Sequence, residues 1–195
     1  MNTNNIDFFI EHYWFQANEI KPVKQRSTKV LKTVLTIVLA LSCFSCLTPA
    51  PAAEQHITAD QVKQYTCIKE ALHYEARGEH QAGMQAVLSV IHNRTKHKEF
   101  PKTYCDVIKQ PMQFSYRNGF SNQEVRLNAF KPANTRSEQQ ASTIAADLAY
   151  RAAMGRFKPS MQPQVLYYCS TKITPTWSKK MKTYATIGNH RFFAT

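Results

Sequence analysis

Apolar residues at helical spacing on both sides of Gly78 constrain the fold more than any other feature of the sequence. Upstream of this glycine, the apolar positions are Val62, Tyr65, Ile68, Leu72 and Ala76. Downstream, they are Met84, Val87, Leu88 and Ile91. Such spacings are typical of helices with one buried face. Thr58 and Gln61 can form a capping box, so we expect one helix from Thr58 to Gly78 and a second from about Glu79 to His97.

Further capping signals and a change of composition predict the remaining elements. Thr103 and Asp106 can open a short helical turn, and Ser137 can begin a third long helix, with an S-E-Q-Q box, that ends at Gly155. Residues 113–134 mix Gly, Asn and Pro with aromatic residues, which predicts an irregular segment. The stretches VLYYCS and KTYATIGNHRFF are β-branched and aromatic, as in a small sheet or hairpin. The sequence therefore predicts an α+β fold in which helices dominate, with a small C-terminal β element.

The N-terminal part of the chain has the organisation of an export signal. Basic residues precede an apolar run at residues 34–47: Lys21, Lys24, Arg26, Lys29 and Lys32. A small-residue stretch follows, and Ala52 is the expected last residue before cleavage. The run is shorter than the roughly 20 residues of a membrane span, although an uncleaved anchor is the alternative. We expect an extension with a signal or anchor at residues 1–53, one domain at residues 54–195, and export to the periplasm or cell envelope.

The charge and the cysteines narrow the choice of partners and compartment. The chain carries 25 Lys and Arg residues against 13 Asp and Glu, a net charge of +12, which favours anionic partners. No aromatic and basic recognition motif accompanies the dispersed lysines, so we expect no nucleic-acid partner. Cys67, Cys105 and Cys169 would remain after export, and they allow one disulfide and one free thiol in three possible pairings.

Glu75 is the strongest candidate for chemistry. It lies three residues beyond Leu72, toward the apolar stripe of the first predicted helix. Burial of a carboxylate without a partner raises its pKa, because desolvation disfavours the charged form. A carboxylic acid that stays protonated near neutrality can protonate the departing oxygen in glycosidic cleavage. The structural alternative is a half-exposed acid paired with Arg77 or a lysine.

Glu79 is the obvious second carboxylate, but its position argues against a two-acid mechanism. Both acids lie on neighbouring turns, whereas the two-carboxylate mechanism needs them on opposite sides of the sugar. We expect Glu79 to have a structural role at the start of the second helix, where exposed N–H groups favour negative charge. Glu75 alone could protonate the glycosidic oxygen and then remove a proton from a hydroxyl of the same sugar, which closes an anhydro ring.

The motifs HYEARGE, AVLSVIHNR and FPKTYCDVIKQPMQFS, followed by IGNHRFF near the end, resemble those of the SleB-type cell-wall hydrolases, the spore-cortex-lytic enzyme family. The resemblance runs from about Tyr65 to Phe193. It implies a lysozyme-like catalytic core and a lytic transglycosylase that cleaves peptidoglycan between N-acetylmuramic acid and N-acetylglucosamine, with no metal or other cofactor. We expect a monomer without stable membrane association after signal cleavage.

The resemblance also implies roles for individual residues. Glu75 would be the single catalytic acid, and four residues would line the cleft: Gln113, Phe114, Tyr168 and His190. Gln113 could bind an N-acetyl group, Phe114 and Tyr168 could stack on sugars, and His190 could bind substrate or a backbone carbonyl. Two departures from the family stand out: Met112 occupies a position where glycine is frequent, and the peptidoglycan-binding module of the spore enzymes is absent. Substrate anchoring is therefore expected to depend on the basic surface.

Three neighbouring residues have both a functional and a structural interpretation. Arg77 could steer wall carboxylates or form a salt bridge at the helix end. Asn93 and Arg94 close the second predicted helix, where the carbonyl ends favour a cation. We expect Asn93 and Arg94 to be structural.

Three other classes of function compete with this interpretation. A zinc amidase or peptidase could use histidines, but none of the candidates shows H-E-x-x-H spacing: His73, His80, His92, His97 and His190. A cysteine peptidase could use Cys105 near a helix start, although no local signature surrounds it. A basic secreted protein that binds wall polymer or nucleic acid is the non-enzymatic alternative.

Overall fold

The computed structural model describes residues 56–119 and 129–195. The expected extension and signal at residues 1–53 lie outside this part of the chain, as does the middle of the predicted irregular segment. The described residues belong to one compact unit. No helix among them is long and apolar enough to cross a membrane.

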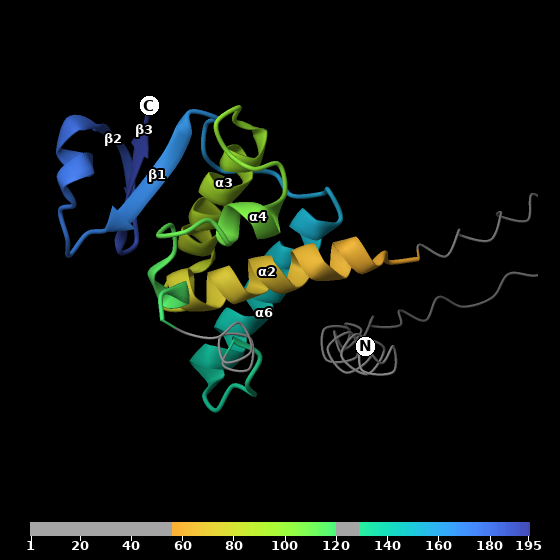
Figure 1. Ribbon diagram of the computed structural model, residues 1–195. Helices are drawn as coiled ribbons and strands as arrows, with labels where there is room; N and C mark the ends of the chain where they lie inside the picture. The colour runs from red at the N-terminus through yellow and green to blue at the C-terminus, as the bar shows by residue number, and fades with distance from the viewer. Residues whose placement is uncertain (1–55, 120–128) are drawn as a thin grey trace, which may run out of the picture. The chain divides into compact units, whose positions relative to one another are not determined.

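Helices dominate the fold, and a small sheet follows them at the C-terminus (Figure 1). The helices are α2 (Ala59–Ala76), α3 (Gln81–Lys96), α4 (Tyr104–Ile108), the 3-10 helix η1 (Ser115–Arg117) and α6 (Arg136–Ala153). The later elements are β1 (Val165–Ser170), the 3-10 helix η2 (Thr176–Lys180), β2 (Lys182–Ile187) and β3 (His190–Ala194). The strands form an antiparallel sheet in the order β1-β3-β2. The predicted α+β class with a C-terminal β element is confirmed.

Local capping explains where α2 begins. The Thr58 side chain accepts the Gln61 N–H at 3.2 Å, and the Gln61 side chain accepts the Thr58 N–H at 2.8 Å. This is the capping box that the sequence predicted, and it satisfies two backbone donors that the first turn leaves unpaired. The helix ends at Ala76, two residues before Gly78.

Two predicted helix starts are wrong by one or two residues. The second helix begins at Gln81 with His80 as its N-cap, so Glu79 lies before the helix and not in its first turn. The α6 helix begins at Arg136, because Thr135 and Glu138 form the capping box in place of Ser137 and its S-E-Q-Q motif. Glu138 accepts the N–H groups of both Asn134 and Thr135, at 3.0 and 3.1 Å, which favours the earlier start.

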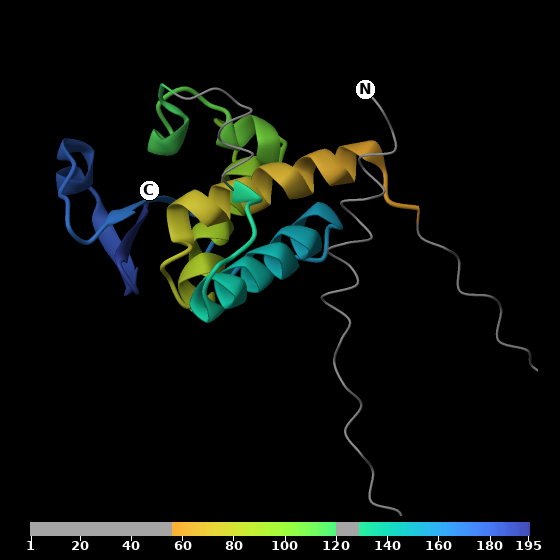
Figure 2. The same ribbon diagram turned by 90° about the horizontal axis from the view of Figure 1, so that it is seen from below.

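The helices share one core and support the sheet from one side. Residues from α2, α3, α6 and the sheet contribute to it, among them Leu72, Leu88, Leu148, Val165 and Phe192. A disulfide joins Cys67 of α2 to Cys105 of α4, which selects one of the three possible pairings and leaves Cys169 as a buried thiol. Figures 1 and 2 show the sheet beside the C-terminal end of α2, where Glu75 lies.

Candidate active site

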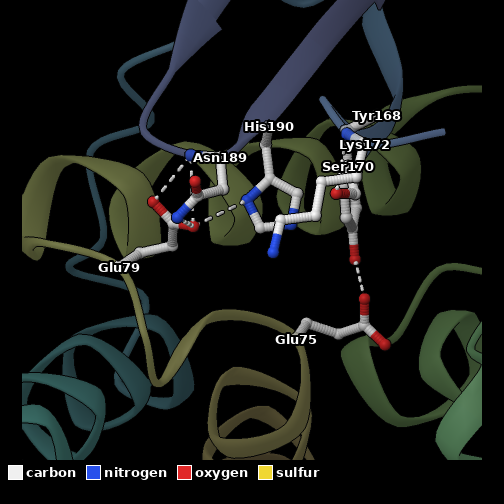
Figure 3. Close-up of polar contacts among 7 residues, drawn as sticks. All are labelled: Glu75, Glu79, Tyr168, Ser170, Lys172, Asn189 and His190. Atoms are coloured by element: carbon white, nitrogen blue, oxygen red, sulfur yellow. Dashed lines mark hydrogen bonds and ion pairs between the residues drawn. The ribbon is translucent and has the colours of Figure 1, made fainter.

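Glu75 lies in the last turn of α2, beneath the sheet, and its side chain points toward β1 (Figure 3). The residue is half-buried, and its Oε2 atom accepts a hydrogen bond from the Tyr168 hydroxyl at 2.9 Å. Burial raises the pKa of Glu75, and the Tyr168 hydrogen bond opposes part of this rise. The site therefore contains a carboxyl group whose protonated form is favoured relative to an exposed glutamate.

Tyr168 reaches Glu75 because side chains alternate along β1. Tyr168 is paired with Phe192 of β3, which belongs to the core, so both side chains are on the helical side of the sheet. The Tyr168 ring packs edge-to-face against His190, with centroids 5.4 Å apart. Burial and the neighbouring Glu75 carboxylate raise the pKa of Tyr168 well above its usual value. Tyr168 therefore keeps its proton and donates a hydrogen bond from its neutral hydroxyl to Glu75.

Glu79 has a structural role, as expected, but the hydrogen bonds of its carboxylate go to the turn between β2 and β3, while its side chain also lies beside Gly83 in the first turn of α3. Its carboxylate accepts the backbone N–H of Asn189 at 3.1 Å and the Asn189 side-chain N–H at 3.0 Å. Its Oε1 atom also lies 3.5 Å from Nδ1 of His190 (Figure 3). Only 5% of the Glu79 side chain is exposed. These contacts leave Glu79 with little access to a substrate or to an attacking water.

His190 is positioned between Glu79 and Tyr168, at the start of β3. Burial lowers the pKa of His190, while the Glu79 carboxylate acts in the opposite direction. The imidazole is therefore neutral near pH 7 and can offer one donor and one acceptor. The imidazole lies beside Tyr168, which the resemblance also assigned to the cleft, and its contact with substrate remains a prediction.

Arg94 and Asn93 connect α3 to the segment that leads into β1. Asn93 donates from its amide to the carbonyls of Gln162 and Val165, at 2.7 and 3.1 Å. Arg94 donates to the Leu166 carbonyl at 2.8 Å and to Oε1 of Gln113 at 3.0 Å. The side chains of Asn93 and Arg94 thus bind backbone carbonyls, and Arg94 also orients Gln113. Arg94 binds the Gln113 amide oxygen and so orients the amide group, whose nitrogen can donate to another partner.

Phe114 does not take the place in the cleft that the sequence predicted, and the role of Arg77 stays a prediction. Phe114 is only 2% exposed and belongs to the core, so its ring offers no face for a sugar. Arg77 is exposed at the end of α2 and forms no ion pair with Glu75 among the described residues. It lines a cavity of about 1010 Å³ with Lys69, His73, His80 and Lys131. Neither Glu75 nor Tyr168 lines this cavity.

Sequence reasoning missed an aromatic stack beside the site. Tyr74 precedes Glu75, and its ring stacks on Tyr116 with centroids 4.5 Å apart and planes 6° from parallel. Tyr116 and Arg117 both donate to the buried carboxylate of Glu70 in the same helix. In the sequence, the position of Tyr74 directly before Glu75 was the one signal for this stack. Its partner Tyr116 lies in the predicted irregular segment, where no periodic spacing indicates which side chains meet.

The five candidate histidines do not assemble into a metal site in the described part of the chain. No group of three or more His, Cys, Asp or Glu side chains is placed there so as to hold a metal ion. His92 instead makes a 2.6 Å hydrogen bond with the Tyr104 hydroxyl. Cys105, the candidate thiol nucleophile, is in the disulfide, which contradicts the cysteine-peptidase alternative.

The sequence of this chain matches a family of known enzymes. The sequence model described as cell wall hydrolase matches residues 78–193, which is more than half of the chain. The chain belongs to the cell wall hydrolase family and is an enzyme. The matched range includes Glu79, Gln113, Tyr168 and His190, and it begins three residues after Glu75.

Two solved structures are similar to the chain, and both are SleB catalytic domains. One is the catalytic domain of the germination-specific lytic transglycosylase SleB from Bacillus anthracis, with 22% identity, 73% of this chain and 99% of that chain covered, and a TM-score of 0.45. The other is the catalytic domain of the Bacillus cereus SleB protein, with 22% identity, 73% and 94% covered, and a TM-score of 0.44. No curated protein matches the sequence.

Proposed function

We propose that this enzyme is exported and cleaves the glycan strand of peptidoglycan between N-acetylmuramic acid and N-acetylglucosamine as a lytic transglycosylase. The observation that carries the proposal is the Glu75 carboxyl, half-buried and hydrogen-bonded to Tyr168, with its pKa raised by burial. Membership of the cell wall hydrolase family supports the substrate class.

The proposed reaction uses Glu75 twice. In the first half, the Glu75 carboxylic acid gives its proton to the glycosidic oxygen, and the bond from the anomeric carbon to that oxygen breaks. In the second half, a hydroxyl of the same sugar attacks the anomeric carbon, and the Glu75 carboxylate takes the proton of that hydroxyl. The products are a strand with a free hydroxyl and a strand that ends in an anhydro ring. No water is consumed, and Glu75 is protonated again.

The surroundings of the two carboxylates favour one acid over two. A hydrolytic mechanism needs a second carboxylate that activates water or attacks the sugar. Glu79 is the neighbouring candidate, but its oxygens face Asn189 and His190, and its side chain is 5% exposed. An internal hydroxyl of the substrate replaces the activated water, because proximity in the bound sugar lowers the entropic barrier.

Tyr168 has a defined part in this cycle. Its hydroxyl donates to Glu75 and stays neutral, so it orients the carboxyl without competing for the proton. When Glu75 becomes a carboxylate, the same hydrogen bond stabilises the negative charge. We therefore assign Tyr168 the role of a positioning residue, in addition to any contact with the sugar.

The disulfide supports the export part of the proposal. Disulfides persist in oxidising compartments such as the periplasm, and the chain has one between Cys67 and Cys105. The predicted signal precedes this domain in the sequence. N-terminal sequencing of the protein recovered from the cell envelope should begin after Ala52, and a chain that keeps residues 34–47 would indicate an anchor.

Mass spectrometry of the fragments released from purified sacculi tests the proposed reaction. A lytic transglycosylase releases muropeptides with anhydro ends, each lighter by one water than the hydrolysis product. Muropeptides with new reducing ends would overturn the transglycosylase mechanism. Cleaved peptide cross-links with intact glycan strands would point to an amidase or peptidase.

A further inference from the structure

The C-terminal segment that forms the sheet and η2 carries positive charge and no acidic residue of its own. Residues 165–195 contain five Lys and Arg residues and no Asp or Glu, and the last acidic residue of the chain is Asp147. The side-chain carboxylates that the described contacts bring to this sheet are Glu75, on Tyr168, and Glu79, on Asn189 and His190, and both lie on the inner side. Exposed lysines and aromatic residues gather around η2 and β2, and we call them the basic sheet surface: Trp177, Lys179, Lys180, Lys182 and Tyr184.

The fold holds this surface away from Glu75. Tyr168 points to Glu75, so its neighbour Tyr167 projects from the opposite face of the sheet. Trp177 packs against Tyr167 and Phe193 with centroids 5.8 and 5.4 Å apart, which fixes η2 over that outer face. Figure 1 shows the turn between β1 and β2, which contains η2, on the side of the sheet that faces away from α2 and α3.

The exposed groups of this surface are of two kinds. Trp177 and Tyr184 are each 41% exposed, although large aromatic residues are usually covered in a folded domain. The three lysines next to them are exposed, and no acidic side chain among the described residues forms an ion pair with them. Flat apolar rings beside uncompensated positive charges match a polymer that presents sugar faces and carboxylates.

We propose that the basic sheet surface binds uncut peptidoglycan through the carboxylates of its stem peptides and the faces of its sugars. This inference rests on the proposed function for its choice of polymer. The η2 part of the surface lies over the face of the sheet opposite to Tyr168 and Glu75, so the surface acts as an anchor apart from the candidate acid. It retains the enzyme on an insoluble wall between cleavage events, through contacts that salt screens.

Cosedimentation with purified sacculi tests this surface in a Glu75→Gln background, which prevents digestion during the measurement. The test variant replaces three lysines of the surface by Gln: Lys179, Lys180 and Lys182. The control makes the same charge change at three exposed lysines outside the sheet: Lys63, Lys98 and Lys158. Thermal unfolding of both triple variants first confirms that each is folded.

The expected result is a loss of binding that depends on position, salt and carboxylates. The surface variant should bind about tenfold more weakly at low salt, while the control stays within about twofold. High salt should reduce the difference, because the Debye length falls from about 10 Å at 0.1 M to about 3 Å at 1 M. Sacculi whose carboxylates have been amidated should bind the parent protein and the surface variant equally weakly. Tyr184→Ser, which removes an exposed ring without changing charge, should also weaken binding.

Four results would overturn the assignment. They are equal binding by the two triple variants, undiminished binding to amidated sacculi, undiminished binding by Tyr184→Ser, and binding of single-stranded DNA as tight as that of sacculi. Cleavage is scored separately, on short soluble glycan fragments and with Glu75 intact. Binding that depends on the surface, without glycan cleavage, would uphold the surface and contradict the proposed reaction. Cleavage without such binding would contradict the surface alone.

Discussion

At the scale of single residues, the site depends on a carboxyl group whose surroundings favour its protonated form. Burial raises the pKa of Glu75, and the Tyr168 hydroxyl limits the rise by stabilising the carboxylate. These opposing effects suit the proposed role, in which Glu75 first gives and then takes a proton, because an efficient acid and base has a pKa near the working pH.

The raised pKa predicts that Glu75→Gln stabilises the fold at neutral and alkaline pH. A group whose pKa is higher in the folded than in the unfolded state contributes stability below its unfolded pKa and loses it as pH rises through the folded pKa. The amide does not titrate, so Tm of the variant should exceed that of the wild type by a few degrees at about pH 8. Thermal unfolding should show this difference shrinking toward about pH 4, and a variant less stable at both ends would contradict the assigned burial effect.

The hydrogen bond from Tyr168 predicts a change in the pH profile of Tyr168→Phe. Without the donor, the pKa of Glu75 rises further, so the alkaline limb of the rate on soluble glycan fragments should move to higher pH. The rate at the optimum should fall by about ten- to a hundredfold, because the carboxyl loses its orientation. Tyr167→Phe, on the opposite face of the sheet, is the matched control and should keep the wild-type profile. An alkaline limb that stays in place in Tyr168→Phe would argue against its positioning role.

Sequence patterns indicate Glu75 as a candidate acid but do not indicate that the Tyr168 hydroxyl binds it. An acid beside an apolar stripe is a local signal, whereas Tyr168 lies 93 positions away and is brought near only by the packing of β1 on the helices. The same limit explains Glu79, whose helix-start position pointed to a local partner while the fold supplied Asn189, 110 positions away. Phe114 was ambiguous in the sequence, because an aromatic residue in an irregular segment can face either the core or a cleft.

At the scale of elements, the turn between β2 and β3 is built around a buried carboxylate. Gly188 has a φ of 56°, and a Cβ atom on it would lie 1.8 Å from Oε2 of Glu79. The carboxylate cannot move aside without losing its hydrogen bonds to Asn189. Position 188 therefore needs glycine for two reasons: its φ is left-handed, and the Glu79 carboxylate leaves no room for a Cβ atom.

Comparing two glycines separates these two requirements. Gly155 also has a left-handed φ of 69°, but nothing lies within 4 Å of a Cβ built there. Gly155→Ala should therefore cost only the conformational penalty, about 1–2 kcal/mol. Gly188→Ala should cost about 1–3 kcal/mol more in the free energy of unfolding, because it displaces Glu79. Urea denaturation of both variants measures the difference, and equal costs would show that the Glu79 contact is not constraining.

The disulfide between α2 and α4 predicts a redox-dependent stability. Cys67 and Cys105 are 38 positions apart. In the chain-entropy model, a loop of that length stabilises the fold by about 4 kcal/mol, so a reducing agent should lower the free energy of unfolding by roughly that amount. Cys169→Ala removes only the free thiol and should leave the effect of the reducing agent unchanged. A reduced protein as stable as the oxidised one would contradict the prediction.

Helices were easier to predict than their starts. Periodicity and the Thr58 box fixed α2, but α6 had two overlapping boxes, and the choice depended on Glu138 accepting two backbone N–H groups. The sheet was predicted from composition, whereas its order β1-β3-β2 depends on long-range pairing that composition does not encode.

At the scale of the whole molecule, the fold separates two kinds of chemistry. The inner side of the sheet faces Glu75 with Tyr168 and His190, and η2 carries Trp177 and exposed lysines over the outer side. Both sides are formed by the same three strands, which lie near the end of the chain. One small sheet thus completes the candidate active site and, by our proposal, carries the contact with the wall.

The rate of glycan release from purified sacculi by Glu75→Gln tests the central claim most directly, measured beside the wild type and Glu79→Gln at equal folded concentration. With Glu75 as the single acid and base, its amide variant should lose about 10²–10⁴-fold in rate. Glu79→Gln should stay within about tenfold of the wild type, because that carboxylate supports a turn. A Glu75→Gln enzyme that keeps the wild-type rate would contradict the account.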